Sequence, residues 1–193
     1  MNIDWKLISR IIGFHSQEFE YVEVPWIVDD VRAINETLPT GHSPLRVENS
    51  QIDGYLVGSA EQSFIRLMLN NDIVPGKYMA ATPCFRDDPV DELHQRHFFK
   101  VELIEILHDD LFKSQKLDDM VAVALAGFNS LNNSRNWKNL RVVETHSGTD
   151  IELNGTEVGS YGYRSIELPD VPRHWIYGTA LAEPRFSYAS KTG

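Results

Sequence analysis

Polar side chains interrupt two apolar, strand-like runs near the centre of the chain. The segment PCFRDDPVDELHQRHFFKVELIEI (83–106) carries Arg86 where the interruption begins and Phe98 where it ends. An arginine can bind phosphate through two parallel hydrogen bonds, and a flat aromatic ring can stack on a base. A hairpin with these ends therefore suits a nucleotide, and His94 in its tip would add a phosphate donor. The segment alone leaves one alternative open, a solvated loop held by salt bridges around one buried phenylalanine.

The strands on either side of this tip each have one polar face. Successive side chains of a strand point to opposite sides, so every second residue shares a face. This period groups Thr82, Cys84 and Arg86 on the first strand, and Phe98, Lys100 and Glu102 on the return strand.

Three carboxylates meet on a second predicted hairpin, DIELNGTEVG. Its central Asn-Gly is the strongest short signal for a two-residue hairpin turn. Such a turn pairs Glu152 with Glu157, places Asp150 opposite Gly159 and puts the three acids on one face. Like charges directly opposite each other destabilise a sheet, and Mg²⁺, which prefers carboxylate oxygens, would relieve the repulsion. The alternative is that the acids extend into water on an exposed face.

The elements expected to position these side chains are mostly antiparallel strands with helices between them, which predicts an α+β fold. Apolar spacing predicts helices over 3–17, from Ser59 as N-cap to about residue 71, and around the stripe Leu117 to Phe128. Residues 29–54 are rich in turn formers and are expected to form loops with short strands. The strands are expected at 19–28, 77–86, 97–107, 139–146, 149–168 and 173–186.

Composition places the chain among ordinary globular proteins. It has 193 residues, 42% of them hydrophobic, and a net charge of −10, which does not attract nucleic acid non-specifically. Cys84 is the only cysteine, so no intrachain disulfide is possible and a reducing compartment is expected. No apolar run approaches the roughly 18 residues of a membrane span, and the N-terminus lacks a signal peptide's layout. We expect one cytoplasmic domain over 1–193 with no membrane partner.

Residues 78–106 resemble motif 2 of the class II aminoacyl-tRNA synthetases, a strand ending in Phe-Arg-x-acid, a loop, and a strand opening on Phe. The helix and following strand, about 3–28, resemble motif 1, a dimer element in that family. The segment around GTALAEPRF, about 174–190, resembles motif 3, a small-residue strand leading to an arginine at the head of a helix. The resemblance implies an antiparallel sheet flanked by helices and a homodimer. It covers nearly the whole chain and leaves no room for an anticodon-binding domain.

The resemblance also implies roles for individual residues. Features similar to seryl enzymes (YLVGSAEQ, TPCFR…KVEL) occur beside features similar to aspartyl enzymes (DIELNGTEVGSYGYR), which relates the chain to ammonia-dependent asparagine synthetase as well. The cofactors implied are ATP and Mg²⁺. The implied assignments are Arg86 for the α-phosphate and the attacking carboxylate, Phe98 for adenine, Arg185 for the γ-phosphate, Asp88 and His94 for ATP, Glu61 for the substrate amino group, Arg164 for a substrate carboxylate, and Asp150 and Glu157, with Glu152, for Mg²⁺.

Several positions depart from the family pattern. Asp88 stands where glutamate is usual, Ala180 and Ala182 where glycines are common, and Pro184 precedes Arg185. The leading hypothesis is an enzyme that activates a small amino acid, acidic or serine-like, as its adenylate. The acyl acceptor is left open between tRNA, a carrier protein, ammonia and another amine. The alternative is a catalytically silent paralogue that acts as a binding or regulatory subunit.

Overall fold

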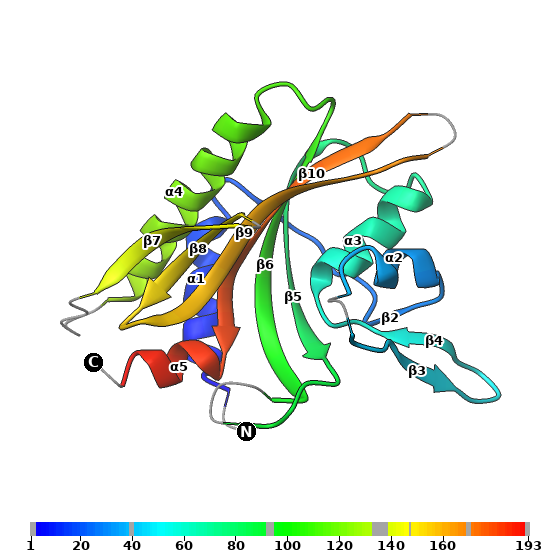
Figure 1. Ribbon diagram of the computed structural model, residues 1–193, viewed down its shortest axis with the longest axis horizontal. Coiled ribbons are helices and arrows are strands. Elements are labelled where there is room, and N and C mark those ends of the chain that lie inside the picture. The colour runs from blue at the N-terminus through cyan, green and yellow to red at the C-terminus, as the bar shows by residue number, and fades with distance from the viewer. Residues whose placement is uncertain are drawn as a thin grey trace.

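A curved seven-stranded sheet forms the centre of the computed structural model, which describes residues 3–38, 41–91, 95–132, 139–146, 148–168 and 171–191 (Figure 1). The helices are α1 (Trp5–His15), α2 (Val31–Asn35), α3 (Ala60–Leu69), α4 (Lys113–Leu131) and α5 (Arg185–Ala189). The strands are β1 (Glu20–Tyr21), β2 (Ile27–Val28), β3 (Leu45–Glu48), β4 (Asp53–Leu56), β5 (Gly76–Phe85), β6 (His97–Leu107), β7 (Leu140–Thr145), β8 (Gly148–Leu153), β9 (Thr156–Ile166) and β10 (Arg173–Glu183).

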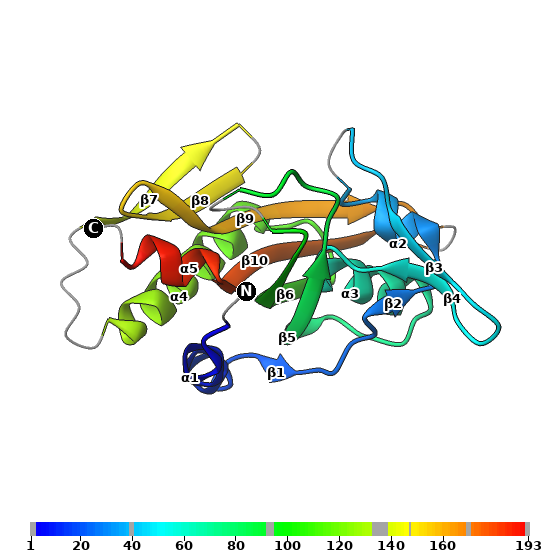
Figure 2. The same ribbon diagram turned by 90° about the horizontal axis from the view of Figure 1, so that it is seen from below.

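The order of the strands in the large sheet is β1-β5-β6-β10-β9-β8-β7. All neighbours pair antiparallel except β1, which runs parallel to β5. A second sheet, β2-β4-β3, lies at the opposite end of the molecule from β7 and β8 (Figure 2). The predicted α+β class, with an antiparallel sheet flanked by helices, is therefore confirmed.

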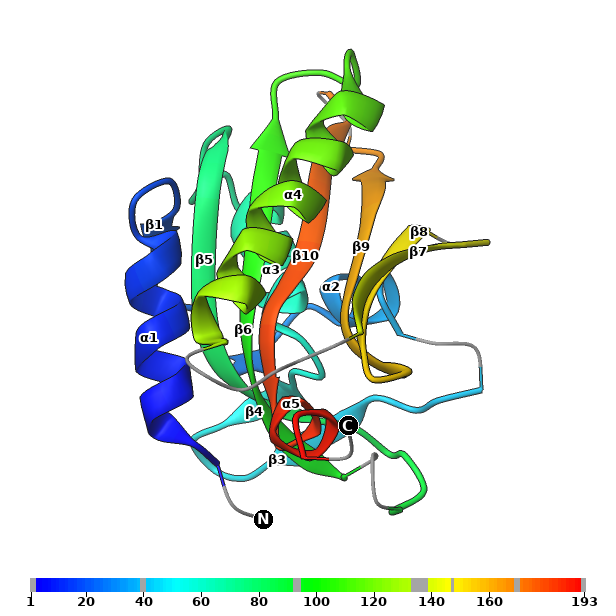
Figure 3. The ribbon, with the colours of Figure 1, turned by 90° about the vertical axis from the view of Figure 1, so that its left-hand side faces the viewer.

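Two apolar clusters hold this arrangement together, one on each face of the large sheet. Helices α1 and α4 lie side by side across one face (Figure 3) and bury residues such as Ile11 and Phe128 against Leu103 of β6. Helix α3 covers part of the other face, where Phe64 and Trp175 are fully buried. Burying apolar surface on both faces is the main stabilising contribution to such a layered fold. The rest of the second face remains for a cavity.

Local sequence explains where the first and third helices begin. The Asp4 side chain accepts hydrogen bonds from the backbone N–H groups of Lys6 and Leu7, and Ser59 accepts one from that of Glu61. Each side chain satisfies N–H groups that have no partner within the helix. The N-cap predicted at Ser59 is confirmed, and it fixes Glu61 in the first turn of α3.

The prediction of one strand over 19–28 is wrong, because the segment divides between two sheets. Strand β1 pairs with β5, whereas β2 pairs with β4. Pro25 lies between the two short strands, and proline has no N–H with which to continue a ladder. The expectation of loops and short strands over 29–54 also missed α2, whose N-cap is Asp30.

The longest helix, α4, is amphipathic, with Met120, Ala124 and Phe128 buried and polar residues on its outer side. Among the described residues, no helix has both the length and the apolar character needed to cross a membrane.

Candidate active site

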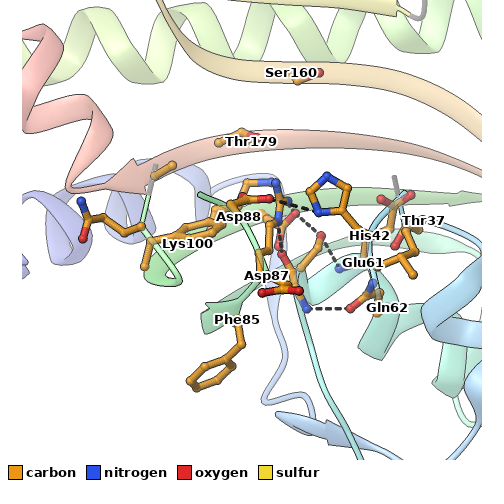
Figure 4. Close-up of a pocket in the computed structure, with 18 of the residues that line it drawn as sticks. Thr37, His42, Glu61, Gln62, Phe85, Asp87, Asp88, Lys100, Ser160 and Thr179 are labelled. Carbon is orange, nitrogen blue, oxygen red and sulfur yellow. Dashed lines mark hydrogen bonds and ion pairs between the residues drawn. The ribbon is translucent and has the colours of Figure 1, made fainter. Parts of the chain in front are cut away.

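A cavity of about 760 Å³ opens on the polar face of the large sheet. Its walls come from the end of β5, the start of β6, strand β9, the second half of β10, the starts of α3 and α5, and the residues that precede β3 (Figure 4). The volume lies in the range of small-molecule sites, roughly 300–1,000 Å³. Of the residues predicted for the site, the cavity wall includes Glu61, Arg86, Asp88, Phe98, Glu157, Arg164 and Arg185.

The predicted central hairpin forms, with β5 and β6 paired antiparallel. Cys84 lies opposite Phe98, so the polar faces of the two strands coincide. The Arg86 guanidinium lies 5.2 Å from the centroid of the Phe98 ring, in a cation–π contact. Arg86 Nε–H also donates to the carbonyl oxygen of Gly58 at 3.1 Å. These contacts hold the guanidinium at the mouth of the hairpin and leave its terminal nitrogens for an anionic ligand.

Glu61 is a buried carboxylate held from two sides. One oxygen accepts from Arg164 Nη1 at 2.6 Å, and the other accepts from the indole Nε1–H of Trp175 at 2.7 Å. Burial raises the pKa of Glu61, while Arg164 and Trp175 oppose that effect. Arg164 is fixed as well, because its guanidinium lies 4.4 Å from the centroid of the Tyr177 ring. The structure thus brings together the two residues predicted to contact the substrate.

Glu102 is a second buried carboxylate, and the site predictions did not include it. Its oxygens accept from the Ser59 hydroxyl at 2.6 Å, the Ala60 backbone N–H and Lys100 Nζ at 2.8 Å. Burial alone would raise the pKa of Glu102, but these donors outweigh it and hold the pKa below its ordinary value. Glu102 thereby ties β6 to the turn that carries Glu61. The shared face of Phe98, Lys100 and Glu102 was the only signal of this in the sequence.

The acidic hairpin also forms, with one change of register. Asn154 and Gly155 both have positive φ (53° and 83°), as a type I′ turn requires. Glu152 lies opposite Glu157 as predicted, but Asp150 faces Ser160 rather than Gly159. The prediction for Asp150 is wrong because a bulge adds one residue to β9 beyond Glu157, which shifts the later pairs by one.

Two of these acids are each neutralised by an arginine side chain. Arg141 binds Glu152 at 2.7 Å, and Arg185 binds Glu157 at 3.2 Å. Burial, together with Glu157 and Glu152, raises the pKa of Asp150. Within the described ranges, no group of three or more histidine, cysteine or acidic side chains is placed to hold a metal. Asp150 and Glu157 still fit Mg²⁺ chemically, because Mg²⁺ commonly takes one or two carboxylates together with substrate phosphates and water.

Two further predicted residues have different outcomes. Asp88 lies at the cavity wall 3.2 Å from Nδ1 of His42, a residue that the sequence did not single out. His94 lies outside the described residues. The segment predicted as motif 3 forms β10 and the five-residue helix α5, with Ala180 buried at a bulge between Thr179 and Leu181.

No family model matches the sequence. The chain is 32% identical over 127 residues to the serine–tRNA ligase of Rickettsia felis, across 56% of this chain and 28% of that protein. The chain thus spans about a quarter of the length of this curated relative.

Solved structures match over almost the whole chain. The cytoplasmic serine–tRNA ligase of Naegleria fowleri in complex with AMP has a TM-score of 0.72 and 16% identity, covering 94% of this chain and 46% of that one. PylSc, a pyrrolysyl-tRNA synthetase of Desulfitobacterium hafniense, has a TM-score of 0.70 and 15% identity, covering 97% of this chain and 69% of that one. The seryl-tRNA synthetase of Pyrococcus horikoshii complexed with ATP has a TM-score of 0.69 and 18% identity, covering 97% of this chain and 48% of that one. At these identities the likeness shows the fold.

Proposed function

Because the chain folds as a class II aminoacyl-tRNA synthetase-like catalytic core, we propose that it activates a small amino acid with ATP. The carboxylate of the amino acid would attack the α-phosphorus, forming an aminoacyl-adenylate and releasing pyrophosphate. No covalent enzyme intermediate is needed. The protein would contribute by positioning the reactants and stabilising the developing charge.

The contact between Arg86 and Phe98 is the observation that carries this proposal. It places a guanidinium beside an aromatic ring at the wall of a cavity large enough for a nucleotide. Three other arginine or lysine side chains in the described part of the wall are each held by a carboxylate, Lys100 by Glu102, Arg164 by Glu61 and Arg185 by Glu157. In the described part of the chain, no carboxylate is paired with Arg86. Arg86 is therefore proposed to bind the α-phosphate while Phe98 stacks on adenine, in line with the AMP and ATP bound to the two structural relatives.

The charge of the cavity supports a divalent cation as cofactor. Among the described residues, its wall carries four arginine or lysine side chains against seven carboxylates, which are those of Glu61, Asp87, Asp88, Asp91, Glu102, Glu157 and Glu183. A nucleoside triphosphate would be repelled by this excess of negative charge. We propose that Asp150 and Glu157 hold Mg²⁺, which would neutralise the phosphates when bound. Arg185 would then leave Glu157 to meet the γ-phosphate.

Two features favour the alternative of a silent paralogue that binds but does not activate. Arg185, proposed for the γ-phosphate, is already engaged by Glu157. The helix that follows it, α5, has only five residues. The enzyme remains the better-supported proposal, because an exposed ion pair contributes little free energy, about 0–1 kcal/mol, and a polyphosphate can displace it.

The partners are part of the same proposal. We propose a homodimer formed through residues 3–28, where Trp5 (59%) and Trp26 (55%) are exposed. Large exposed aromatic side chains commonly anchor interfaces. The acyl acceptor stays open between tRNA, a carrier protein, ammonia and another amine.

Amino-acid-dependent exchange of pyrophosphate into ATP, measured with each of the twenty amino acids, tests the proposal directly. Calorimetry of Mg·ATP binding tests the nucleotide site separately. Arg86→Ala should weaken ATP binding by about 1.5–3 kcal/mol, the contribution of a charge-assisted hydrogen bond. Arg32→Ala is the matched control, because Arg32 is an exposed arginine outside this cavity and paired with Asp30. ATP binding without exchange would favour the silent paralogue, and unchanged ATP affinity in Arg86→Ala would exclude the proposed nucleotide site.

A further inference from the structure

Four charged side chains form what we term the charged subsite, which consists of Glu61, Lys100, Glu102 and Arg164. They line the same cavity as Arg86 and Phe98. Arg164 binds Glu61 at 2.6 Å and Lys100 binds Glu102 at 2.8 Å. Two positive and two negative groups therefore cancel within the subsite before any substrate enters.

The Glu61–Arg164 pair is not available for exchange with a ligand at low cost. The Glu61 carboxylate is buried, with its second oxygen bound to the indole of Trp175. Arg164 is positioned by Glu61 and by the Tyr177 ring together. If a ligand took Arg164, it would leave Glu61 as a buried charge without its cation. Leaving a buried carboxylate without its cation in this way is unfavourable, although the Arg164 side chain itself is 32% exposed.

The remaining surface of the subsite is polar and uncharged. Thr179 lies opposite Glu102 on β10, and Ser160 projects from the neighbouring strand β9; both line the cavity (Figure 4). Behind the ion pair, Trp175 is fully buried and Tyr177 is covered by the Arg164 guanidinium. A side chain entering here meets the hydroxyl groups of Ser160 and Thr179 and the Tyr177 ring beneath the Arg164 guanidinium.

We propose that the charged subsite selects amino acids with uncharged side chains and rejects acidic ones, an inference that rests on the proposed amino-acid activation. An acidic side chain would add a third carboxylate beside Glu61 and Glu102. A basic side chain would meet Arg164 and Lys100, whose carboxylates are already paired. The substrate's own ammonium group is compatible, because each carboxylate oxygen of Glu61 can accept a second hydrogen bond.

This assignment changes the role expected of Arg164. The aspartyl-like part of the resemblance implied that Arg164 binds a carboxylate of the substrate. In the structure Arg164 Nη1 already donates to a carboxylate of the protein itself, that of Glu61, at 2.6 Å. Arg164 is thus a positioning residue for Glu61, and it sets specificity by charge.

Aspartate and asparagine form the sharpest test, because they have nearly the same shape and differ in charge. Pyrophosphate exchange should be at least about a hundredfold slower with aspartate than with asparagine or a smaller neutral amino acid, as expected when a buried ion pair must be broken. Calorimetry with non-reactive sulfamoyl analogues of the seryl, asparaginyl and aspartyl adenylates gives the same comparison without catalysis.

The variant Glu61→Gln releases Arg164 and should raise the ratio of aspartyl to asparaginyl analogue affinity by at least about tenfold. Asp87→Asn is the control, because it removes a carboxylate from the cavity wall without touching Arg164, and the ratio should not change. If the wild type binds the aspartyl analogue as well as the asparaginyl one, the charge filter is refuted while amino-acid activation stands. If it binds none of the analogues, the proposed function fails and this inference fails with it.

Discussion

Replacing Glu102 by glutamine should destabilise the fold more than its conservative chemistry indicates. The carboxylate of Glu102 accepts from three donors, the Ser59 hydroxyl, the Ala60 N–H and Lys100 Nζ. A glutamine has one acceptor oxygen, so its amide group must face at least one of these donors. Lys100, whose side chain is only 15% exposed, would also lose its counter-charge.

The expected loss follows from this geometry. Removing one partner of a buried ion pair costs about 3–5 kcal/mol, and the lower end applies because glutamine keeps one or two of the hydrogen bonds. For a chain of this length, each kcal/mol lowers Tm by roughly 2–4 °C, so Glu102→Gln should melt about 6–12 °C below the wild type. Differential scanning calorimetry and urea unfolding at pH 7 measure the difference.

Glu105→Gln provides the matched control on the same strand. Glu105 is also buried, but it is held by Lys116, whose side chain is 40% exposed. The Lys116 ammonium group is well solvated without the carboxylate. The loss in free energy of unfolding in Glu105→Gln should therefore stay near or below about 1 kcal/mol. Equal losses in the two variants, or a loss below about 1 kcal/mol in Glu102→Gln, would refute the reasoning about the Glu102 network.

The pH dependence gives an independent check. The pKa of Glu102 is held below its ordinary value of 4.5, since its three donors outweigh the effect of burial. A depressed carboxyl pKa stabilises the fold above the unfolded-state pKa, and this contribution is lost as the pH falls through the folded-state pKa. The difference in stability between the wild type and Glu102→Gln should therefore shrink below about pH 4.5.

Three other predictions concern separate parts of the molecule. Glu157→Gln should abolish the tightening of ATP binding by Mg²⁺ in calorimetric titrations. It should change the free energy of unfolding by about 1 kcal/mol or less, because the Glu157 side chain is 47% exposed and that of its partner Arg185 is 26% exposed. An unchanged effect of Mg²⁺ would exclude Glu157 as a ligand. Trp26→Ala should weaken the proposed dimer by about 2 kcal/mol or more, roughly thirtyfold in dissociation constant, and a monomeric wild-type mass in light scattering at micromolar concentration would refute the interface. Burial lowers the pKa of His15 from 6.5 to about 4, so the neutral ring is favoured in the fold and about 2 kcal/mol of stability should be lost between pH 7 and pH 5; His15→Leu, followed by urea unfolding at both pH values, should show no such loss from this site.

Several parts of the fold and site were predictable because their signals are local. The Asn-Gly turn requires two residues with positive φ, and those two residue types adopt it readily, so the β8–β9 hairpin could be placed from ten letters. The strand period alone grouped Phe98, Lys100 and Glu102 on one face, and the cavity wall includes all three. Ser59 could be identified as an N-cap because capping depends on side chains within three residues.

The bulge in β9 could not be predicted from local sequence signals. The position at which β9 gains a residue depends on its pairing with β8. One inserted residue moved Asp150 from Gly159 to Ser160. The division of 19–28 between two sheets also depends on distant pairing, since β1 pairs with β5 and β2 pairs with β4, and both partners lie far along the chain.

The sequence by itself determined the two hairpins, the N-cap at Ser59 and the set of chemically capable side chains, because those depend on neighbours a few residues away. Only the tertiary structure decided which of these side chains neutralise one another. Glu61 meets Arg164 and Trp175 across separations of 103 and 114 residues, and no local pattern encodes such a pairing. Helix α3, which carries Glu61, packs on the face where β10 and β9 pair Trp175 with Arg164. The mutual neutralisation of Glu61 and Arg164 there, rather than the presence of Arg164, sets the charge that a substrate meets.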